Sequence, residues 1–295
     1  MFARYAALSL LALVAAQDSS SASQTDIEII EANFQNAELV PEFISSFSPQ
    51  GILNVEYDGG SALSPGQNLS QSSVSSTPSL SILPSSNASD ISGDNRYTVI
   101  LADANVVGTD ESTEAQTRHW LVNGASLDTS SAPWTVTYTN ATSITDYAGP
   151  APPGGSGPHR YVFMVYYQPD SFQAPANLST ANTPVSTFFV SQYVQESGLG
   201  ALVAATYMQV ENGTPTGTIP ATTAVDTATI GQSTSSGSSG SSTSHASASG
   251  TESARASGAS ASGSGAAGAA KDLGWSAIVG GLGVVGAVLG AAIVV

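Results

Sequence analysis

Six short runs rich in β-branched and aromatic residues set the strongest limit on how this 295-residue chain folds. Turn-forming stretches such as DGGS, LSPGQN, SGDN and PAPPGGSGP separate them. The runs are ILNVEY (52–57), YTVILAD (97–103), HWLVN (119–123), WTVTYT (134–139), RYVFMVYYQ (160–168) and ATYMQVE (205–211). Runs of this length and composition are typical of β-strands. We therefore predict a mostly β domain over residues 17–220.

One segment, NTPVSTFFVSQYVQESGLG (182–200), has helical periodicity instead. Thr183 is suited to cap a helix, Pro184 to its first turn and Gly198 to its end. The apolar residues at helical spacing are Val185, Phe188, Phe189 and Tyr193. The sequence therefore predicts one helix near the C-terminal end of the domain.

Residues 1–16 have the pattern of a secretory signal peptide, because Arg4 precedes an apolar stretch and Val14-Ala15-Ala16 provides a cleavage site before Gln17. A buried N-terminal helix is the alternative. Five Asn-x-Ser/Thr sequons agree with a secretory route, since this tripeptide is the acceptor for N-glycosylation. The candidate sites are Asn68, Asn87, Asn140, Asn177 and Asn212.

The composition changes twice toward the C-terminus. Residues 221–270 are rich in Ser, Thr, Gly and Ala and cannot bury a core, which predicts a disordered, O-glycosylated stalk. Residues 271–295 combine a polar spacer with an apolar tail, the pattern of a glycosylphosphatidylinositol (GPI) attachment signal that is removed. A membrane-spanning helix is the alternative, but no basic residue follows to stop transfer. Candidate attachment residues are Ser262, Gly263, Ser264 and Gly265.

The chain carries a net charge of -16 and contains no cysteine. We expect no nucleic-acid partner, because phosphate backbones are bound through clustered Lys and Arg. Without cysteine, neither a disulfide framework nor a thiolate metal site can form. Residues 17–220 contain no lysine, and their three arginines are Arg96, Arg118 and Arg160.

Two of these arginines adjoin histidines at the starts of predicted strands, in the pairs Arg118-His119 and His159-Arg160. Strand alternation places His159 and Tyr161 on one face and Arg160 on the other. Imidazole, phenol and carboxylate groups together can hold a small anion, or a ligand with both phosphate and amine. The candidate ligand-binding residues are Asp103, His119, His159 and Tyr161. The alternative is that both histidines are ordinary hydrogen-bonding residues at strand ends.

The segment GPAPPGGSGPHRY (149–161) resembles, over its whole length, the signature G-P-x-P-P-x-G-x-G-x-H-R-Y of the phosphatidylethanolamine-binding protein (PEBP) family, also called the Raf kinase inhibitor protein family. A second family motif, D-P-D-x-P followed by a histidine, is matched more loosely around Asp103 and His119. There, Ala104, Asn105 and Val107 depart from the motif. LSPGQN and GLGALVAATY are similar to secreted fungal GPI-anchored members.

The resemblance implies a large central antiparallel sheet, a second smaller sheet and a C-terminal helix. It also implies that the four candidate residues line a pocket for phosphate and phosphoethanolamine head groups. The rim of this pocket would include Arg118, Ala151 and Pro152. An X-Pro bond in the proline-rich loop is a candidate for the cis form.

The sequence favours a binding protein over an enzyme, because it shows no H-E-x-x-H, no G-x-S-x-G and no acid–base pair of carboxylates. Ser156 lies in a Gly/Pro-rich loop, which is a poor mount for a nucleophile. We expect a secreted protein, GPI-anchored in the outer leaflet or cell wall, that binds a phospholipid head group or small anion and uses no cofactor. The alternatives are an inhibitor of secreted serine proteases or carboxypeptidases, and a hydrolase in which two histidines and an aspartate hold a metal.

Overall fold

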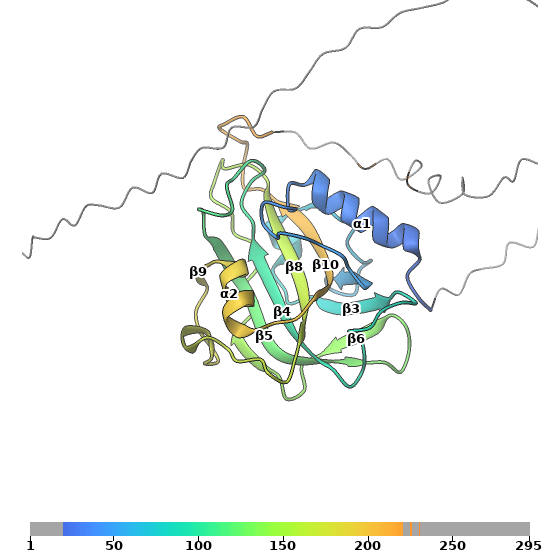
Figure 1. Cartoon of the computed structure of the whole chain (residues 1–295). Helices are drawn as coiled ribbons and strands as arrows, with labels where there is room; N and C mark the ends of the chain where they lie inside the picture. Colours follow the sequence, from blue (N-terminus) through green and yellow to red (C-terminus); the bar gives the residue numbers. More distant parts are fainter. Residues whose placement is uncertain (1–19, 221–224, 226–229, 231–295) are drawn as a thin grey trace, which may run out of the picture. The chain divides into compact units, whose positions relative to one another are not determined.

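The computed structural model describes residues 20–220 and the single residues 225 and 230. Figure 1 shows a curled β-sheet accompanied by few helices. The helical elements are α1 (Gln24–Asn36), η1 (Gln71–Val74), η2 (Ala176–Leu178) and α2 (Val190–Ser197). The strands are β1 (Gly51–Glu56), β2 (Gln67–Leu69), β3 (Ser79–Pro84), β4 (Arg96–Asp103), β5 (Gln116–Asp128), β6 (Trp134–Thr137), β7 (Thr142–Thr145), β8 (His159–Gln168), β9 (Ser186–Phe188) and β10 (Leu202–Val210).

The predicted signal peptide and GPI signal lie outside the described residues, as does nearly all of the predicted stalk. Within the part that is described, no helix has both the length and the hydrophobicity needed to cross a membrane.

The strands follow one path in the order β1-β3-β6-β5-β4-β8-β10-β2, and β7 and β9 also pair with β5. β2 pairs with β10 in parallel, and the other pairings are antiparallel. The end of β5, residues 126–128, pairs with β6, whereas the rest of β5 pairs with β4. Gly124 is the extra residue of a β-bulge in the β4–β5 ladder, and its φ of 83° is a conformation that glycine adopts without strain. The predicted large antiparallel sheet with a smaller second sheet is confirmed.

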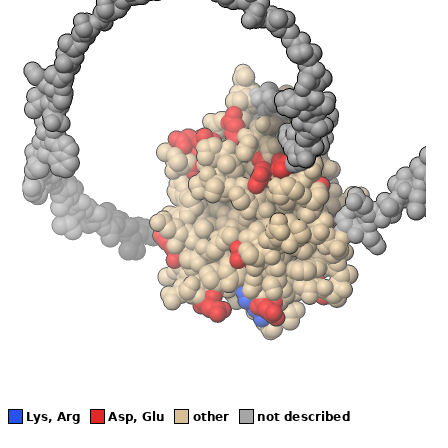
Figure 2. Space-filling model, turned by 45° about the vertical axis from the view of Figure 1, so that its right-hand side comes forward, with Lys and Arg blue, Asp and Glu red and all other residues tan. Residues whose placement is uncertain are grey.

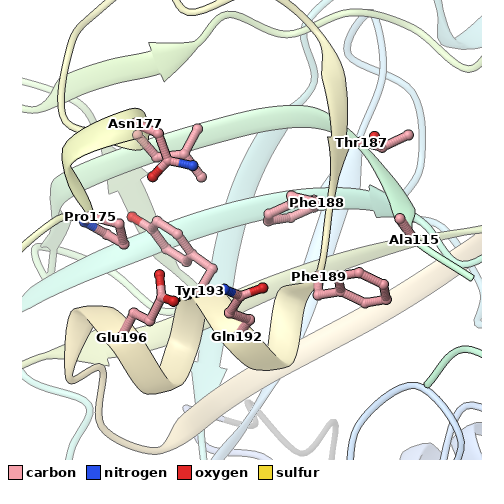
Figure 3. Close-up of a pocket in the computed structure, with 10 residues that line it drawn as sticks. Ala115, Pro175, Asn177, Thr187, Phe188, Phe189, Gln192, Tyr193 and Glu196 are labelled. Carbon is pink, nitrogen blue, oxygen red and sulfur yellow. Dashed lines mark hydrogen bonds between the residues drawn. The ribbon is translucent and has the colours of Figure 1, made fainter. Parts of the chain in front are cut away.

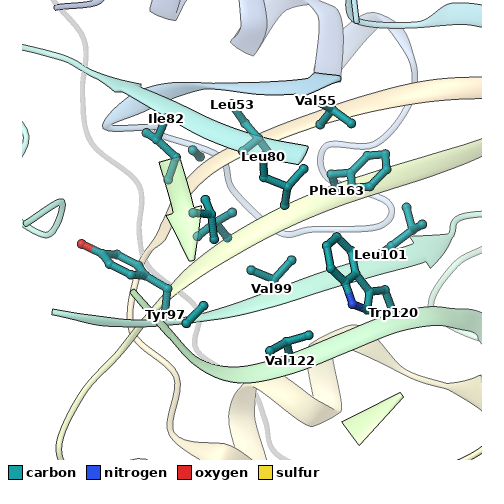
Figure 4. Packing of buried hydrophobic residues seen from close by; sticks show 14 of the residues in the cluster. Leu53, Val55, Leu80, Ile82, Tyr97, Val99, Leu101, Trp120, Val122 and Phe163 are labelled. Carbon is teal, nitrogen blue, oxygen red and sulfur yellow. The ribbon is translucent and has the colours of Figure 1, made fainter. Parts of the chain in front are cut away.

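Apolar clusters form on both faces of the central strands. Val99 and Leu101 of β4 point into one cluster and Ile100 into the other, as strand alternation requires. Figure 4 shows the first cluster, which is filled by side chains of β1 and β3 on one side and of β4 and β5 on the other. Phe34 of α1 and Tyr193 of α2 pack in the second cluster, so both helices cover the same face of the large sheet.

All six predicted strands are present, but β5 extends over Gln116–Asp128 and is much longer than the predicted 119–123, while the other five differ by a few residues at their ends. The predicted C-terminal helix is α2, but it begins at Val190 and not near Thr183, because residues 186–188 are extended and pair with β5. It ends at Gly198 as predicted, with φ 69°. Among the described residues, the cis peptide bonds precede Pro41 and Pro133, so the proline-rich loop contains none.

The sequence interpretation missed α1 and four short strands, β2, β3, β7 and β9. A signal for α1 is present, because the Ser23 side chain accepts from the Asp26 amide and the Asp26 carboxylate accepts from the Ser23 amide. Its buried residues also have helical spacing, at Ile27, Ile30 and Phe34.

Candidate functional site

Asp103 at the end of β4 and His159 at the start of β8 meet at one edge of the large sheet. Asp103 lies opposite Tyr161 in the antiparallel β4–β8 pair, so His159 projects from the same face two residues away. His159 Nδ1 is 2.9 Å from Asp103 Oδ2 and 3.0 Å from Oδ1. The backbone amide of Asn105 also donates to Asp103 Oδ1, at 2.8 Å. The buried carboxylate therefore fixes the orientation of the His159 ring.

The second ring nitrogen of His159 faces the Gly/Pro-rich loop. Its Nε2 is 2.9 Å from Ser156 Oγ, and the Ser156 hydroxyl donates to the carbonyl oxygen of Pro153 at 2.8 Å. Asp103, His159 and Ser156 therefore form a continuous chain of contacts at this edge of the sheet.

His119 reaches the same place from β5. The Tyr161 ring lies 5.3 Å from the His119 ring and 6.4 Å from the His159 ring, measured between centroids. His119 Nδ1 donates to the carbonyl oxygen of Ala148 at 2.9 Å, which makes Nε2 the acceptor nitrogen of the neutral ring. Burial lowers the pKa of His119 and favours its neutral form. The structure thus brings all four candidate residues together.

A β-bulge in β5 produces the position of His119. Leu101 pairs with Trp120 and the next residue of β4, Ala102, pairs with Arg118, so His119 is an extra residue in the ladder. As a result, His119 and Trp120 both project toward the first apolar cluster. Simple alternation would place them on opposite faces.

The Tyr161 hydroxyl is the least satisfied group of the site. It is buried and has no hydrogen-bond partner among residues 20–220, although the Asp103 carboxylate and the Ala151 backbone lie near it. Burial, with the Asp103 charge second, raises the pKa of Tyr161 far above its usual value, so the hydroxyl keeps its proton. An unpaired buried hydroxyl costs about 1–3 kcal/mol, and a ligand oxygen would supply the missing acceptor.

The Arg160 side chain points away from the site and stabilises the loops that carry it. Its guanidinium is 1% exposed and pairs with Glu111 Oε1 at 2.9 Å. It also donates to the carbonyl oxygens of Ala37, Glu38, Ala104, Asn105 and Val106. Because three of these carbonyls directly follow Asp103, Arg160 fixes the loop that carries the site carboxylate.

The structure places the three predicted rim residues in different surroundings. Arg118 lies on the face opposite the site, where it donates to Thr145 Oγ1 at 2.7 Å and to the Pro184 carbonyl at 2.8 Å. Arg118 pairs with Ala102 of β4, which belongs to the second apolar cluster. Ala151 is exposed beside Tyr161, and the neighbouring Pro152 is buried.

The hypothesis of a metal centre gains no support from this geometry. Within the described residues, no group of three or more His, Asp or Glu side chains is arranged to hold a metal ion.

A family model described as phosphatidylethanolamine-binding protein matches residues 44–208. The chain belongs to the PEBP family. The match includes the four candidate residues and the whole 149–161 signature. It begins after α1, which packs in the second apolar cluster.

Three similar proteins illustrate the relationship. The carboxypeptidase Y inhibitor of Saccharomyces cerevisiae is 31% identical over 146 residues, 42% of this chain and 66% of that protein, just under two thirds of its length. CEN-like protein 1 of Nicotiana tabacum is 28% identical over 60% of this chain and 91% of its own length. A crystal structure of carboxypeptidase Y inhibitor complexed with the cognate proteinase superposes with a TM-score of 0.52 and 24% identity, covering 64% of this chain and 98% of that one. This structural likeness shows the fold.

The sequence interpretation also missed a cavity of about 270 Å³ beside α2. Figure 3 shows Gln192, Tyr193 and Glu196 of α2 facing Phe188 of β9 and Asn177 of η2 across it. None of the four candidate residues lines this cavity. The candidate site is much more enclosed, since its residues are 0–7% exposed.

Glu111 generates a prediction about pH. Burial raises its pKa from 4.5 to about 7, against the lowering effect of its Gln116, Arg160 and Asn105 partners. The folded state therefore binds this proton more tightly than the unfolded state, and the resulting stabilisation is complete below about pH 4.5 and is lost as the pH rises through about 7. We expect a lower melting temperature at pH 8 than at pH 5, by about 2–4 °C for each kcal/mol involved.

Thermal unfolding followed by circular dichroism across this pH range provides the measurement. Glu111→Gln should flatten the dependence, whereas Glu114→Gln, at an exposed position nearby, should keep it. An equal slope in the wild type and in Glu111→Gln would contradict the assignment.

Proposed function

We propose that this PEBP-family protein is a secreted cell-surface protein that binds a phosphate-bearing head group or a small anion at Asp103, His119, His159 and Tyr161. The observation that carries the proposal is the buried Tyr161 hydroxyl, which lacks a partner and lies between two imidazole rings. A phosphate oxygen beside Tyr161 would accept this hydrogen bond.

The remaining groups suit a ligand that carries both phosphate and amine, as phosphoethanolamine does. His119 Nδ1 donates to the Ala148 carbonyl, so Nε2 accepts a hydrogen bond when the ring is neutral and donates one when it is protonated. The Asp103 carboxylate attracts an ammonium group. The site can therefore complement either a plain anion or a zwitterionic head group.

Binding without catalysis is the activity we assign to this site, with no cofactor. The Ser156 hydroxyl donates to the Pro153 carbonyl, and its Gly/Pro-rich loop is a poor position for a nucleophile, which supports binding over catalysis.

Attachment to the cell surface through a GPI anchor, as in secreted fungal members of the family, is part of the proposal. It rests on the sequence of residues 1–16 and 221–295. The side chains of all five sequon asparagines are exposed, which suits N-glycosylation along a secretory route: Asn68, Asn87, Asn140, Asn177 and Asn212.

Inhibition of a secreted protease is the second candidate function. The 31% identity to a protein named carboxypeptidase Y inhibitor favours it, and so does the shared fold with an inhibitor crystallised with its cognate proteinase. Anion binding and inhibition can reside on different surfaces of one domain, so either function can hold alone.

Head-group binding is tested by calorimetry with inorganic phosphate and with phosphoethanolamine. Tyr161→Phe removes only the hydroxyl, and we expect affinity to fall about 10-fold or more, because a hydrogen bond to a charged group is worth about 1.5–3 kcal/mol. His159→Ala should weaken binding further. Tyr166→Phe, a buried tyrosine in the second cluster, is the matched control and should bind as the wild type does. Equal affinities of the wild type, Tyr161→Phe and His159→Ala would refute the site.

Surface attachment is tested on intact cells. Phosphatidylinositol-specific phospholipase C should release the wild-type protein, and deletion of residues 271–295 should send it into the medium. Protein that stays in the membrane after the enzyme treatment and dissolves only in detergent would favour the membrane-spanning alternative.

Protease inhibition is tested with a panel of secreted serine peptidases and serine carboxypeptidases. We expect at least one enzyme to lose activity in a saturable manner at micromolar protein. Full activity of every enzyme under these conditions would remove this candidate, and the calorimetry would be unaffected.

A further inference from the structure

A second cavity, of about 350 Å³, lies beside Trp120 and has a chemistry unlike that of the anion site. Aromatic side chains form much of its wall: Trp120, Tyr138 and Tyr147. The Trp120 ring lies 5.5 Å from the Tyr138 ring and 5.6 Å from the Tyr147 ring, and it is nearly perpendicular to the latter at 89°. Three rings at these angles form a corner lined with aromatic surface.

Hydrogen bonds and burial fix the positions of two of these rings. The Tyr147 hydroxyl donates to the Val74 carbonyl at 2.7 Å and lies 2.8 Å from the Tyr57 hydroxyl. Trp120 is 4% exposed, and the bulge at His119 turns it toward this side of the sheet. A preformed aromatic corner loses little entropy when a ligand enters.

Two polar groups of the cavity are not satisfied by the protein. The Tyr138 hydroxyl is buried without a hydrogen-bond partner. Asp146 is exposed, and Ser143 donates to its Oδ1 at 2.5 Å, so its other oxygen has no partner among the described residues. The cavity therefore offers a negative charge and a hydroxyl oxygen beside aromatic rings.

These features favour a positively charged ligand. The negative faces of aromatic rings attract cations, and Asp146 repels anions. A neutral apolar molecule would leave the Tyr138 hydroxyl unpaired. A metal ion would need several oxygen or nitrogen ligands, and a single carboxylate does not provide them.

Among the described residues, no arginine lines this cavity. Arg118 lies over the Phe188 ring, and Arg160 is enclosed by carbonyl groups on the opposite face of the sheet. The remaining arginine of the described residues, Arg96, contacts the Asn95 carbonyl.

We infer that this cavity binds the ammonium group of a small organic amine. The rings of Trp120, Tyr138 and Tyr147 contact its alkyl part and its charge, Asp146 balances the charge, and the Tyr138 hydroxyl accepts one N–H. This inference does not depend on anion binding at Tyr161, because the two sites share none of these groups.

The test is a titration of the purified full-length protein with propylammonium chloride, followed by tryptophan fluorescence, with n-propanol as the neutral probe of similar size. We expect a saturable change for the amine with a dissociation constant of about 1 mM, and a much weaker response to the alcohol. Asp146→Asn should weaken amine binding about 5–10-fold, and Tyr138→Phe should weaken it several-fold.

Asp170→Asn is the matched control, because Asp170 is exposed and does not line the cavity. It should bind as the wild type does, and unchanged melting temperatures would show that all three variants fold. The inference is overturned by the absence of a saturable response, by equal binding of alcohol and amine, or by equal losses in Asp146→Asn and Asp170→Asn.

Discussion

The candidate site depends on the hydrogen bonds and the ion pair of the buried Arg160 guanidinium. It joins the end of α1, the loop after Asp103 and the carboxylate of Glu111, segments that are distant in the sequence. Its planar fork of five donors can satisfy many carbonyl groups at once, which a lysine cannot do. His159 directly precedes Arg160 on β8. His159 is a site residue, and Arg160 fixes the loop that positions Asp103, the hydrogen-bond partner of His159.

The bulge in β5 has a comparable effect on the opposite edge of the site. One extra residue directs His119 toward Tyr161 and turns Trp120 toward the aromatic cavity. Two chemically different surfaces therefore arise from adjacent residues of one strand. The segment after β7 links them, because the Ala148 carbonyl orients His119 and the preceding residue, Tyr147, forms a wall of the cavity.

The sequence predicts features that depend on neighbouring residues better than features that depend on contacts between segments distant in the chain. The strand runs and the separation of His159 and Tyr161 from Arg160 are local consequences of alternation, and the sequence interpretation found them. The placement of His119 and Trp120 on one face depends on a bulge, which period-2 reasoning cannot detect. The helix start was misplaced because Ser186–Phe188 is held extended by pairing with β5, a contact between distant segments. α1 had a readable capping box and was overlooked.

The charge distribution separates the two kinds of site. Figure 2 shows acidic side chains scattered over one face of the molecule, with basic side chains confined to one small area. With a net charge of -16, the surface repels anions at a distance and attracts cations. Anion binding must therefore come from short-range hydrogen bonds inside an enclosed site, where Tyr161 and the imidazoles replace the lost hydration. The same negative potential attracts an amine to the exposed Asp146. An amine therefore needs fewer specific contacts than an anion does, and it can bind at the cavity beside Trp120.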